Sequence, residues 1–430
     1  MYRNAIEKLI EWKDDPERKP MVLRGARQVG KTWIMKEFGE KYYEKYFYFN
    51  FDEDNQLASI FENKDASKII ELLGFVAGEK LLAGKHLIIF DEVQECPNAL
   101  NSLKYFCEDA REYHVIAAGS LLGTLLAQPK SYPVGKVNLL EIGPLTFDEF
   151  LRAVEPGIFE YYHSISRESK VENIFHGKLM DILNYYLIIG GMPECVASWL
   201  TYKDPKRIDV IQKELLQLYE NDFSKHNGKV NAGRILMVFR SIGTQLAKEN
   251  HKFVYGLVRE GARAREYEEA IEWLVSAGML IRVNNVTKLE HPLNVYEKIE
   301  HFKLYMFDVG LLKQLAGVAN EAILLNADYQ FKGAMAENFV IQQIKEIFDS
   351  SVKYFSPSSV MEIDFVVQNG MEVIPMEVKA GEAVKGNSFK KYLDKYKPKI
   401  AVRYSGLGYD VTERFVNIPL YLAGKTKELI

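Results

Sequence analysis

Two glycines and a lysine–threonine pair at fixed spacing are the residues of this chain best suited to bind phosphate. Gly25 precedes Gly30-Lys31-Thr32, and an expected helix from Trp33 to Phe38 follows directly. Backbone N–H groups can surround phosphate oxygens only where the chain has the conformational freedom of glycine. A lysine here would contact the β- and γ-phosphates of ATP, a threonine hydroxyl would bind Mg²⁺, and the helix N-terminus would add its dipole. This spacing is that of a P-loop. The predicted ATP-binding residues are those of the whole loop: Gly25, Ala26, Arg27, Gln28, Val29, Gly30, Lys31 and Thr32.

An aspartate–glutamate pair supplies the second half of the same chemistry. Asp91 and Glu92 end an apolar run downstream of the P-loop. Asp91 would hold Mg²⁺ through water, and Glu92 would orient and polarise the water that attacks the γ-phosphate. A solvated acidic strand end is the alternative. Ser120, at the end of a further apolar run, could sense the γ-phosphate, although a plain turn serine would look the same.

A second group of charged residues lies near the end of the chain. Asn369-Gly370 is a strong hairpin signal, and with these two residues as the loop Glu362 faces Glu377. Because side chains alternate along a strand, Glu362, Asp364, Glu377 and Lys379 share one face. Two like charges directly opposite each other repel. A divalent cation would resolve that repulsion, whereas an exposed hairpin with alternating charges would need none.

Short apolar runs predict the strands that must position the first group. They span Met21–Leu23, Tyr46–Phe51, Lys85–Glu92 and Tyr113–Ser120. Helical spacing of apolar residues places helices over Tyr2–Trp12 and Ala66–Val76. Strand ends that carry a P-loop, an acid pair and a serine imply a mostly parallel sheet with its ligand at the carboxyl edge.

Several motifs together resemble one family of ATPases. Residues 141–150, Glu-Ile-Gly-Pro-Leu-Thr-Phe-Asp-Glu-Phe, and the P-loop Gly-Ala-Arg-Gln-Val-Gly-Lys-Thr are similar to AAA-type ATPases of bacteria and archaea that carry a C-terminal DUF4143 domain. Gly190–Glu194 and Lys303–Leu312 match further signatures of this family, so the resemblance covers nearly the whole chain. It implies an ATPase core, a helical and winged-helix middle, and a C-terminal domain similar to PD-(D/E)XK nucleases.

The nuclease resemblance assigns roles to four C-terminal residues. In that pattern Glu337, Asp364 and Glu377 would hold Mg²⁺ or Mn²⁺, and Lys379 would position the water that attacks a phosphodiester. A nuclease fold can also persist as a scaffold without activity, so the resemblance leaves cleavage open. A local basic stretch could neutralise nucleic-acid phosphates. It contains Lys385, Lys390, Lys391, Lys395, Lys397, Lys399 and Arg403.

The middle of the chain has the order of a winged helix. An amphipathic helix before Gly278 is followed by Met279–Val283 and by a returning strand near Lys303–Phe307. DNA binding would use the preceding arginines at 259, 263 and 265. The alternative is a packing module, because neighbouring glutamates dilute the positive charge. The expected apolar helix face consists of Tyr267, Ala270, Ile271, Leu274 and Val275.

Composition limits the classes of protein that remain. The 430-residue chain has 47% hydrophobic residues and a net charge of -4, which gives no overall attraction to nucleic acid. The cysteines, Cys96, Cys107 and Cys195, are too few and too scattered for a disulfide framework or a zinc site and fit a reducing cytoplasm. Apolar runs stay well short of the roughly 18 residues of a membrane span, and we expect no signal peptide.

We therefore predict an α/β protein with a P-loop NTPase parallel sheet, a helical and winged-helix middle, and a C-terminal restriction-endonuclease-like α/β domain. The predicted divisions are a P-loop ATPase domain at 1–150, a helical lid at 151–230, a winged-helix-like domain at 231–325 and a nuclease-like domain at 326–430. The first hypothesis is an ATP-hydrolysing enzyme coupled to a metal-dependent nuclease acting on DNA. The rival is an ATP-driven molecular switch whose C-terminal domain binds nucleic acid or a protein partner without cleavage. Expected ligands are ATP, Mg²⁺ and, at the nuclease-like site, Mn²⁺; assembly into a homo-oligomer stays open.

Overall fold

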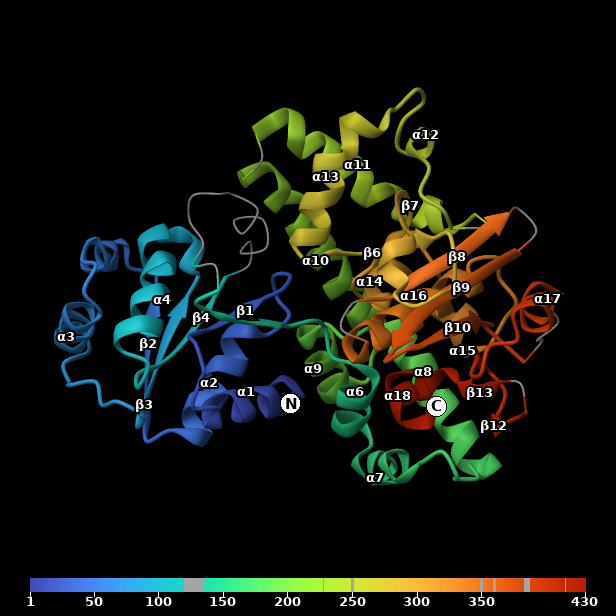
Figure 1. The fold of residues 1–430 in the computed structure, drawn as a ribbon, viewed down its shortest axis with the longest axis horizontal. Coiled ribbons are helices and arrows are strands. Elements are labelled where there is room, and N and C mark those ends of the chain that lie inside the picture. The colour runs from blue at the N-terminus through green and yellow to red at the C-terminus, as the bar shows by residue number, and fades with distance from the viewer. Residues whose placement is uncertain are drawn as a thin grey trace. The chain divides into compact units, whose positions relative to one another are not determined.

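The chain folds into two compact units in the computed structural model (Figure 1). One comprises Met1–Gly143 with Ser276–Met279, and the other comprises Pro144–Val275 with Leu280–Ile430. The structure describes residues 1–119, 133, 135–226, 228–248, 251–348, 351–358, 361–382, 387–413 and 415–430. The predicted γ-phosphate sensor Ser120 and the basic residue Lys385 lie outside the described residues. The predicted α/β class is confirmed in both units.

The first unit contains the predicted parallel sheet. Over the residues that the structure describes, its five strands run in the order β2-β3-β4-β1-β5, and every neighbouring pair is parallel. The strands are β1 (Met21–Arg24), β2 (Lys45–Asn50), β3 (His86–Asp91), β4 (His114–Ala118) and β5 (Asn138–Glu141). The helices are α1 (Ala5–Asp14), α2 (Lys31–Tyr42), η1 (Asn55–Glu62), α3 (Ala66–Ala77), η2 (Val93–Glu95) and α4 (Pro97–Asp109).

Side-chain alternation explains why this sheet is covered on both faces. On β3 every residue is buried, and Ile88 and Phe90 belong to the core that the sheet shares with α3 and α4. The ring of Phe90 meets the ring of Phe106 of α4 edge-on, with centroids 6.0 Å apart. The buried face of α2, which includes Ile34 and Phe38, packs against β2, β3 and β4. Since both faces are filled, ligands can approach only at the strand ends.

The second unit begins with helices and ends in a mixed sheet. Its helices before the sheet are α6 (Phe147–Val154), α7 (Pro156–Ser164), α8 (Asn173–Ile189), α9 (Pro193–Tyr202), α10 (Pro205–His226), α11 (Gly228–Leu246), α12 (Tyr255–Val258) and α13 (Ala264–Ser276). The helices that come after the first strand of the sheet in the sequence are η3 (Leu293–Tyr296), α14 (Val309–Ala316), α15 (Asn320–Leu324), α16 (Lys332–Ile347), α17 (Asn387–Tyr396), η4 (Leu420–Lys425) and α18 (Thr426–Leu429). No described helix combines the length and apolar character needed to cross a membrane.

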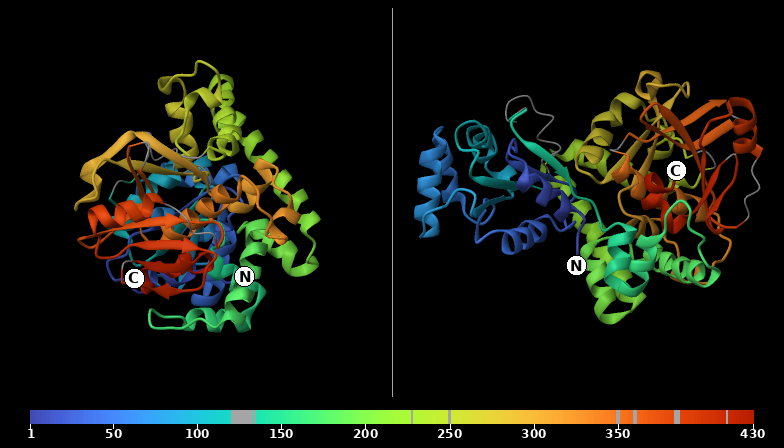
Figure 2. Two further views of the ribbon diagram at one scale, coloured as in Figure 1. Left: turned by 90° about the vertical axis from the view of Figure 1, so that its right-hand side faces the viewer. Right: turned by 60° about the horizontal axis from the view of Figure 1, so that its bottom comes forward.

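One sheet joins the predicted winged-helix and nuclease-like regions. Its eight described strands run in the order β12-β13-β11-β10-β9-β8-β6-β7, coloured gold to red in Figure 2. They are β6 (Leu280–Val286), β7 (Glu297–Met306), β8 (Lys353–Ser358), β9 (Met361–Asn369), β10 (Glu372–Val378), β11 (Val402–Ser405), β12 (Asp410–Val411) and β13 (Val416–Pro419). The hairpin β6–β7 forms one edge of this sheet, so the predicted division at residue 325 falls within the span of a continuous sheet. The four-part division and the winged helix stay predictions.

Three of the motifs that carried the family resemblance meet inside the second unit. The backbone N–H of Leu145 donates to the carbonyl of Gly191 at 2.7 Å, and the N–H of Gly191 donates to Asp308 Oδ2 at 2.7 Å. A Cβ at Gly191 would lie 2.1 Å from the Leu145 carbonyl oxygen, and a Cβ at Gly190 would lie 2.3 Å from Asp308 Oδ1. These motifs therefore hold distant segments together, and their glycines are required by close packing.

Candidate ATPase site and carboxylate cluster

The loop between β1 and α2 has positive φ angles at three residues. Gly25, Gln28 and Gly30 have φ angles of 148°, 63° and 93°, respectively. A Cβ at Gly25 would lie 2.0 Å from the carbonyl oxygen of Ile142. Gly25 is thus needed both by the turn and by the chain segment that follows β5. Gln28 shows that the loop holds even a residue with a side chain in the left-handed region.

The side chain of Lys31 contacts the backbone of the P-loop. Its Nζ donates to the carbonyl oxygens of Gly25 and Ala26, at 2.8 Å each. Burial lowers the pKa of Lys31 to about 8, although Glu92 and Asp91 act in the opposite direction. A cation weakly held by neutral carbonyls would gain from the negative charge of a phosphate.

Thr32 and Asp91 come together at the start of α2 and the end of β3. Thr32 Oγ1 donates to Asp91 Oδ2 at 2.6 Å, and the Tyr48 hydroxyl donates to the same oxygen at 2.9 Å. The backbone N–H of Glu92 donates to Asp91 Oδ1 at 3.0 Å. Burial, and then the Asp91 carboxylate, raise the pKa of Tyr48. A hydroxyl and a carboxylate side by side are oxygen ligands of the kind that Mg²⁺ prefers.

Glu92 is oriented by its backbone and by a neighbouring amide. Its φ and ψ angles are 49° and 41°, in the left-handed region that glutamate rarely adopts. Gln94 Nε2 donates to Glu92 Oε2. A strained backbone conformation at the end of a central strand is typical of functional sites.

The C-terminal hairpin differs from the predicted register by two residues. Asn369 pairs with Glu372, so the loop is Gly370-Met371 and not the predicted Asn369-Gly370. Continuing this register places Asp364 opposite Glu377, in place of the predicted Glu362. The correction follows from the extra pair that Asn369 makes before the chain turns. A shift of two keeps the side-chain alternation, so the four predicted residues still share one face.

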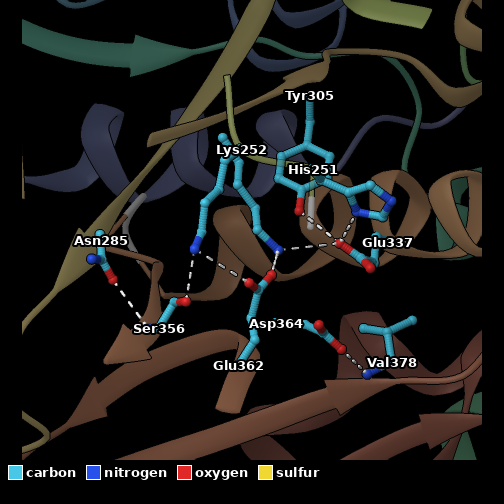
Figure 3. A network of polar contacts seen from close by, with 10 residues as sticks. His251, Lys252, Asn285, Tyr305, Glu337, Ser356, Glu362, Asp364 and Val378 are labelled. Carbon is cyan, nitrogen blue, oxygen red and sulfur yellow. Dashed lines mark hydrogen bonds and ion pairs between the residues drawn. The ribbon is translucent and has the colours of Figure 1, made fainter. Parts of the chain in front are cut away.

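The carboxylates of the hairpin and of the neighbouring helix α16 contact cations and hydroxyls of the protein (Figure 3). Glu337 Oε2, from α16, lies 2.8 Å from His251 Nδ1, 2.8 Å from the Tyr305 hydroxyl and 3.7 Å from Lys303 Nζ. Glu362 Oε1, from β9, lies 2.8 Å from the same Lys303 Nζ. The cluster therefore includes a lysine among its acids, which the sequence analysis did not single out.

The other predicted residues of this group are also engaged. Asp364 Oδ2 accepts from the backbone N–H of Val378 at 2.8 Å, and Glu377 Oε1 lies 3.0 Å from Lys379 Nζ. Burial, reinforced by the charge of Glu337, raises the pKa of Asp364 to about 7. Within the described ranges, no three or more histidine, cysteine, aspartate or glutamate side chains are grouped closely enough to hold a metal ion. Glu337, Asp364 and Glu377 thus share a region without forming a ready ligand set.

Comparison with known families matches both ends of this arrangement. The family model of an AAA domain matches residues 17–151, and that of a domain of unknown function, DUF4143, matches residues 332–422. The chain is a P-loop ATPase of the AAA type with a C-terminal DUF4143 domain. A further domain of unknown function, DUF8612, matches residues 180–322.

Individual relatives of this ATPase are distant. An uncharacterized protein of Methanocaldococcus jannaschii is 23% identical over 398 residues, which cover 90% of this chain and 81% of the relative. A Walker-type ATPase of Pyrococcus abyssi has 15% identity and a TM-score of 0.46, over 73% of this chain and 95% of that one. AMPPCP-bound DnaA from Aquifex aeolicus has 14% identity and a TM-score of 0.29, over 64% and 87% of the two chains.

Arg3 supports the P-loop of this ATPase, and sequence reasoning missed it. Its Nη1 donates to the carbonyl oxygen of Val29 at 2.8 Å, and its Nη2 donates to that of Gly143 at 2.7 Å. Arg3 is only 5% exposed. Its place before the first helix resembles that of any N-terminal charged residue, so the sequence carries no signal for this contact.

Proposed function

We propose that the protein is an ATP-driven molecular switch: its first unit hydrolyses ATP with Mg²⁺, and its C-terminal unit binds nucleic acid or a protein partner without cleaving it. The contact between Thr32 Oγ1 and Asp91 Oδ2, 2.6 Å, is the observation that carries the ATPase part. It brings the two expected Mg²⁺ ligands to one point from separate elements. Free, buried cysteines support the cytoplasm as its compartment.

The residues of the first unit divide the chemistry among them. Loop N–H groups and Lys31 would bind the β- and γ-phosphates, exchanging the carbonyl contacts of Lys31 for charged oxygens. Thr32 and Asp91 would hold Mg²⁺, which neutralises the charge that develops on the transferred phosphoryl group. Glu92, held by Gln94, would orient the attacking water and take its proton.

Two substitutions test the ATPase part. Lys31→Ala should weaken ATP binding by at least about tenfold, since it removes a charge-assisted contact to phosphate. Glu92→Gln keeps the size and hydrogen bonding of the side chain but removes the base. It should therefore bind ATP and hydrolyse it at least about 100-fold more slowly. Calorimetry and steady-state phosphate release measure these effects. Parental affinity in the first variant, or parental turnover in the second, would overturn the assigned roles.

DNA cleavage is the second candidate function. The face shared by Asp364, Glu377 and Lys379, with Lys379 Nζ 3.0 Å from Glu377 Oε1, favours it because this order of residues resembles the PD-(D/E)XK pattern. Incubation with DNA in Mg²⁺ or Mn²⁺, with and without ATP, separates the two candidates. The control is the double variant Asp364→Asn and Glu377→Gln. Cleavage by the parent but not by this control would establish the second candidate. If the parent and the control both give products only at the background level, the result supports the switch.

The region with the predicted winged helix contributes little to DNA binding in this proposal, because its charge is mixed. Arg259, Arg263 and Arg265 share their surroundings with Glu260, Glu266, Glu268 and Glu269. Changing the three arginines to alanine should reduce DNA affinity by less than about tenfold at physiological salt. A loss of several orders of magnitude would make this region the main DNA contact.

A further inference from the structure

We propose that Lys303 takes the place of a divalent cation in the carboxylate cluster of the second unit, so that Glu337 and Glu362 are held together by a cation of the chain itself. This inference goes beyond ATP hydrolysis and does not depend on it. It concerns a position on β7 that neither the hairpin pattern nor the nuclease resemblance assigns a role.

The position of the ammonium group carries the argument. Lys303 Nζ lies 2.8 Å from Glu362 Oε1 of β9 and 3.7 Å from Glu337 Oε2 of α16. The side chain of Lys303 is 1% exposed, so this charge has left water. A lysine buried to this extent is stable only where carboxylates replace its lost hydration. Two acids from separate elements thus face the ammonium group of Lys303.

The fold directs Lys303 to this point. Lys303 pairs with Val283 on β6 and forms an isolated bridge with Lys252. Alternation along β7 puts Lys303 and Tyr305 on the same side of the strand, and both meet Glu337. Lys303 begins the Lys303–Leu312 motif, whose Asp308 binds the Gly190–Gly191 turn. One motif thus supplies both a packing anchor and the counter-charge.

Glu377 and Glu362 have further cations of the chain nearby. Glu377 has Lys379 Nζ at 3.0 Å, and Arg403 acts on it as a further positive charge. Glu362 Oε2 lies 3.8 Å from Lys252 Nζ, whose hydrogen bond goes to Ser356 Oγ at 2.8 Å. Glu337, Glu362 and Glu377 thus each have a lysine Nζ within 3.7 Å.

One carboxylate oxygen of Glu337, Oε2, is used within the protein. Its Oε2 lies 2.8 Å from both the Tyr305 hydroxyl and His251 Nδ1, so two partners take the two lone pairs of this oxygen. Because the ammonium group of Lys303 lies between Glu337 and Glu362, a divalent ion would have to displace it.

Mn²⁺ alone, with no nucleotide, is the probe for the test. All measurements use the full chain in a Lys31→Ala background, so that the P-loop does not contribute a metal response. The parent should show no Mn²⁺-dependent change in melting temperature. Lys303→Met removes the charge at similar length, so it should lower the melting temperature. Mn²⁺ should restore at least about 2 °C by binding the acids that have lost their counter-charge. Adding Glu362→Gln, which removes the acid 2.8 Å from Lys303, should abolish that response.

Matched variants keep the test decisive. Lys298→Met, on the exposed part of the same strand, should change neither the melting temperature nor its response to Mn²⁺. If Lys303→Met does not fold, the double variant Lys303→Met and Glu362→Gln removes both partners of the 2.8 Å pair and should recover folding. A Mn²⁺-linked shift in the parent that Asp364→Asn abolishes, or a Lys303→Met protein as stable as the parent without metal, would overturn the proposal. ATP turnover, measured separately with Lys31 intact, reports on the ATPase assignment alone.

Discussion

Asp308 Oδ2 accepts a hydrogen bond of 2.7 Å from the backbone of Gly191, although the two residues are 117 positions apart in the sequence. Its other oxygen, Oδ1, accepts from the backbone N–H of Leu311 at 2.9 Å. Asp308 is completely buried, and burial raises its pKa to about 6 even though backbone N–H groups act in the opposite direction. The carboxylate of Asp308 thus joins the Lys303–Leu312 motif to the Gly190–Glu194 motif.

Asp308→Asn should destabilise the protein by about 2 kcal/mol, because an amide can accept from only one of the two N–H groups and presents its own NH₂ to the other. Urea unfolding measures this loss. Asp181→Asn, at an exposed position of α8 ahead of the Gly190–Gly191 turn, is the matched control and should stay within about 0.5 kcal/mol. Equal unfolding midpoints for the Asp308 variant and the parent would contradict the role of this carboxylate.

Arg3→Met should weaken ATP binding by about tenfold, because the carbonyls of Val29 and Gly143 lose their charged donors and the P-loop loses a brace. The measurement is the dissociation constant for ATP by calorimetry. Lys8→Met, an exposed cation on the neighbouring helix α1, should leave the affinity unchanged. An Arg3 variant with the parent's affinity would show that the loop holds its shape alone.

Lys31 predicts a pH dependence of ATP affinity. Burial lowers its pKa to about 8 in the nucleotide-free protein, whereas bound phosphates would raise it, so ATP binding above pH 8 should take up a proton. Affinity should fall by about tenfold between pH 7 and pH 9, as the charged fraction of Lys31 falls. Calorimetry in two buffers of different ionisation heat counts the protons. Lys31→Arg stays charged and should show no uptake; a parent with the same affinity at both values of pH would contradict this assignment.

The P-loop and its parallel sheet were predictable because local spacing determines them. Glycines before Lys31-Thr32 and apolar runs that end in acids are short-range signals, and the strands β2, β3 and β4 lie within a residue or two of the predicted runs. Arg3 and Lys303 were not predictable in the same way. Their roles depend on contacts with Val29, Gly143, Glu337 and Glu362, which only the tertiary fold brings near.

The hairpin shows which part of a register the sequence determines. Asn369-Gly370 predicted a turn, and alternation predicted that Asp364 and Glu377 share a face. The shared face depends on the alternation of side chains along a strand, and a register shift of two residues leaves that alternation unchanged. The shift does change which residues lie opposite each other, because Asn369 now pairs with Glu372. For the same reason, the pattern around Met279–Val283 predicted a strand pair but not its place in a larger sheet.

Asp364 provides a last prediction, on the stability of the second unit. Burial, and next the charge of Glu337, raise its pKa to about 7 in the folded protein, against about 4 for an unfolded aspartate. Between about pH 4 and pH 7, Asp364 therefore keeps its proton in the folded state but has released it in the unfolded state. The stability that protonated Asp364 contributes is therefore fully present below about pH 4 and is lost as pH rises through 7.

Asp364→Asn should consequently be more stable than the parent at pH 8, by about 1–3 kcal/mol, because its side chain is neutral and can still accept from the N–H of Val378. The advantage should shrink toward zero by pH 4.5. Urea unfolding at pH 4.5, 6 and 8 measures the difference, with the exposed Asp328→Asn as the matched control that shows no such trend. A variant that is less stable than the parent at pH 8 would mean that ionised Asp364 is stabilised by its surroundings. Asp364 would then be an engaged carboxylate of the kind that the nuclease candidate needs.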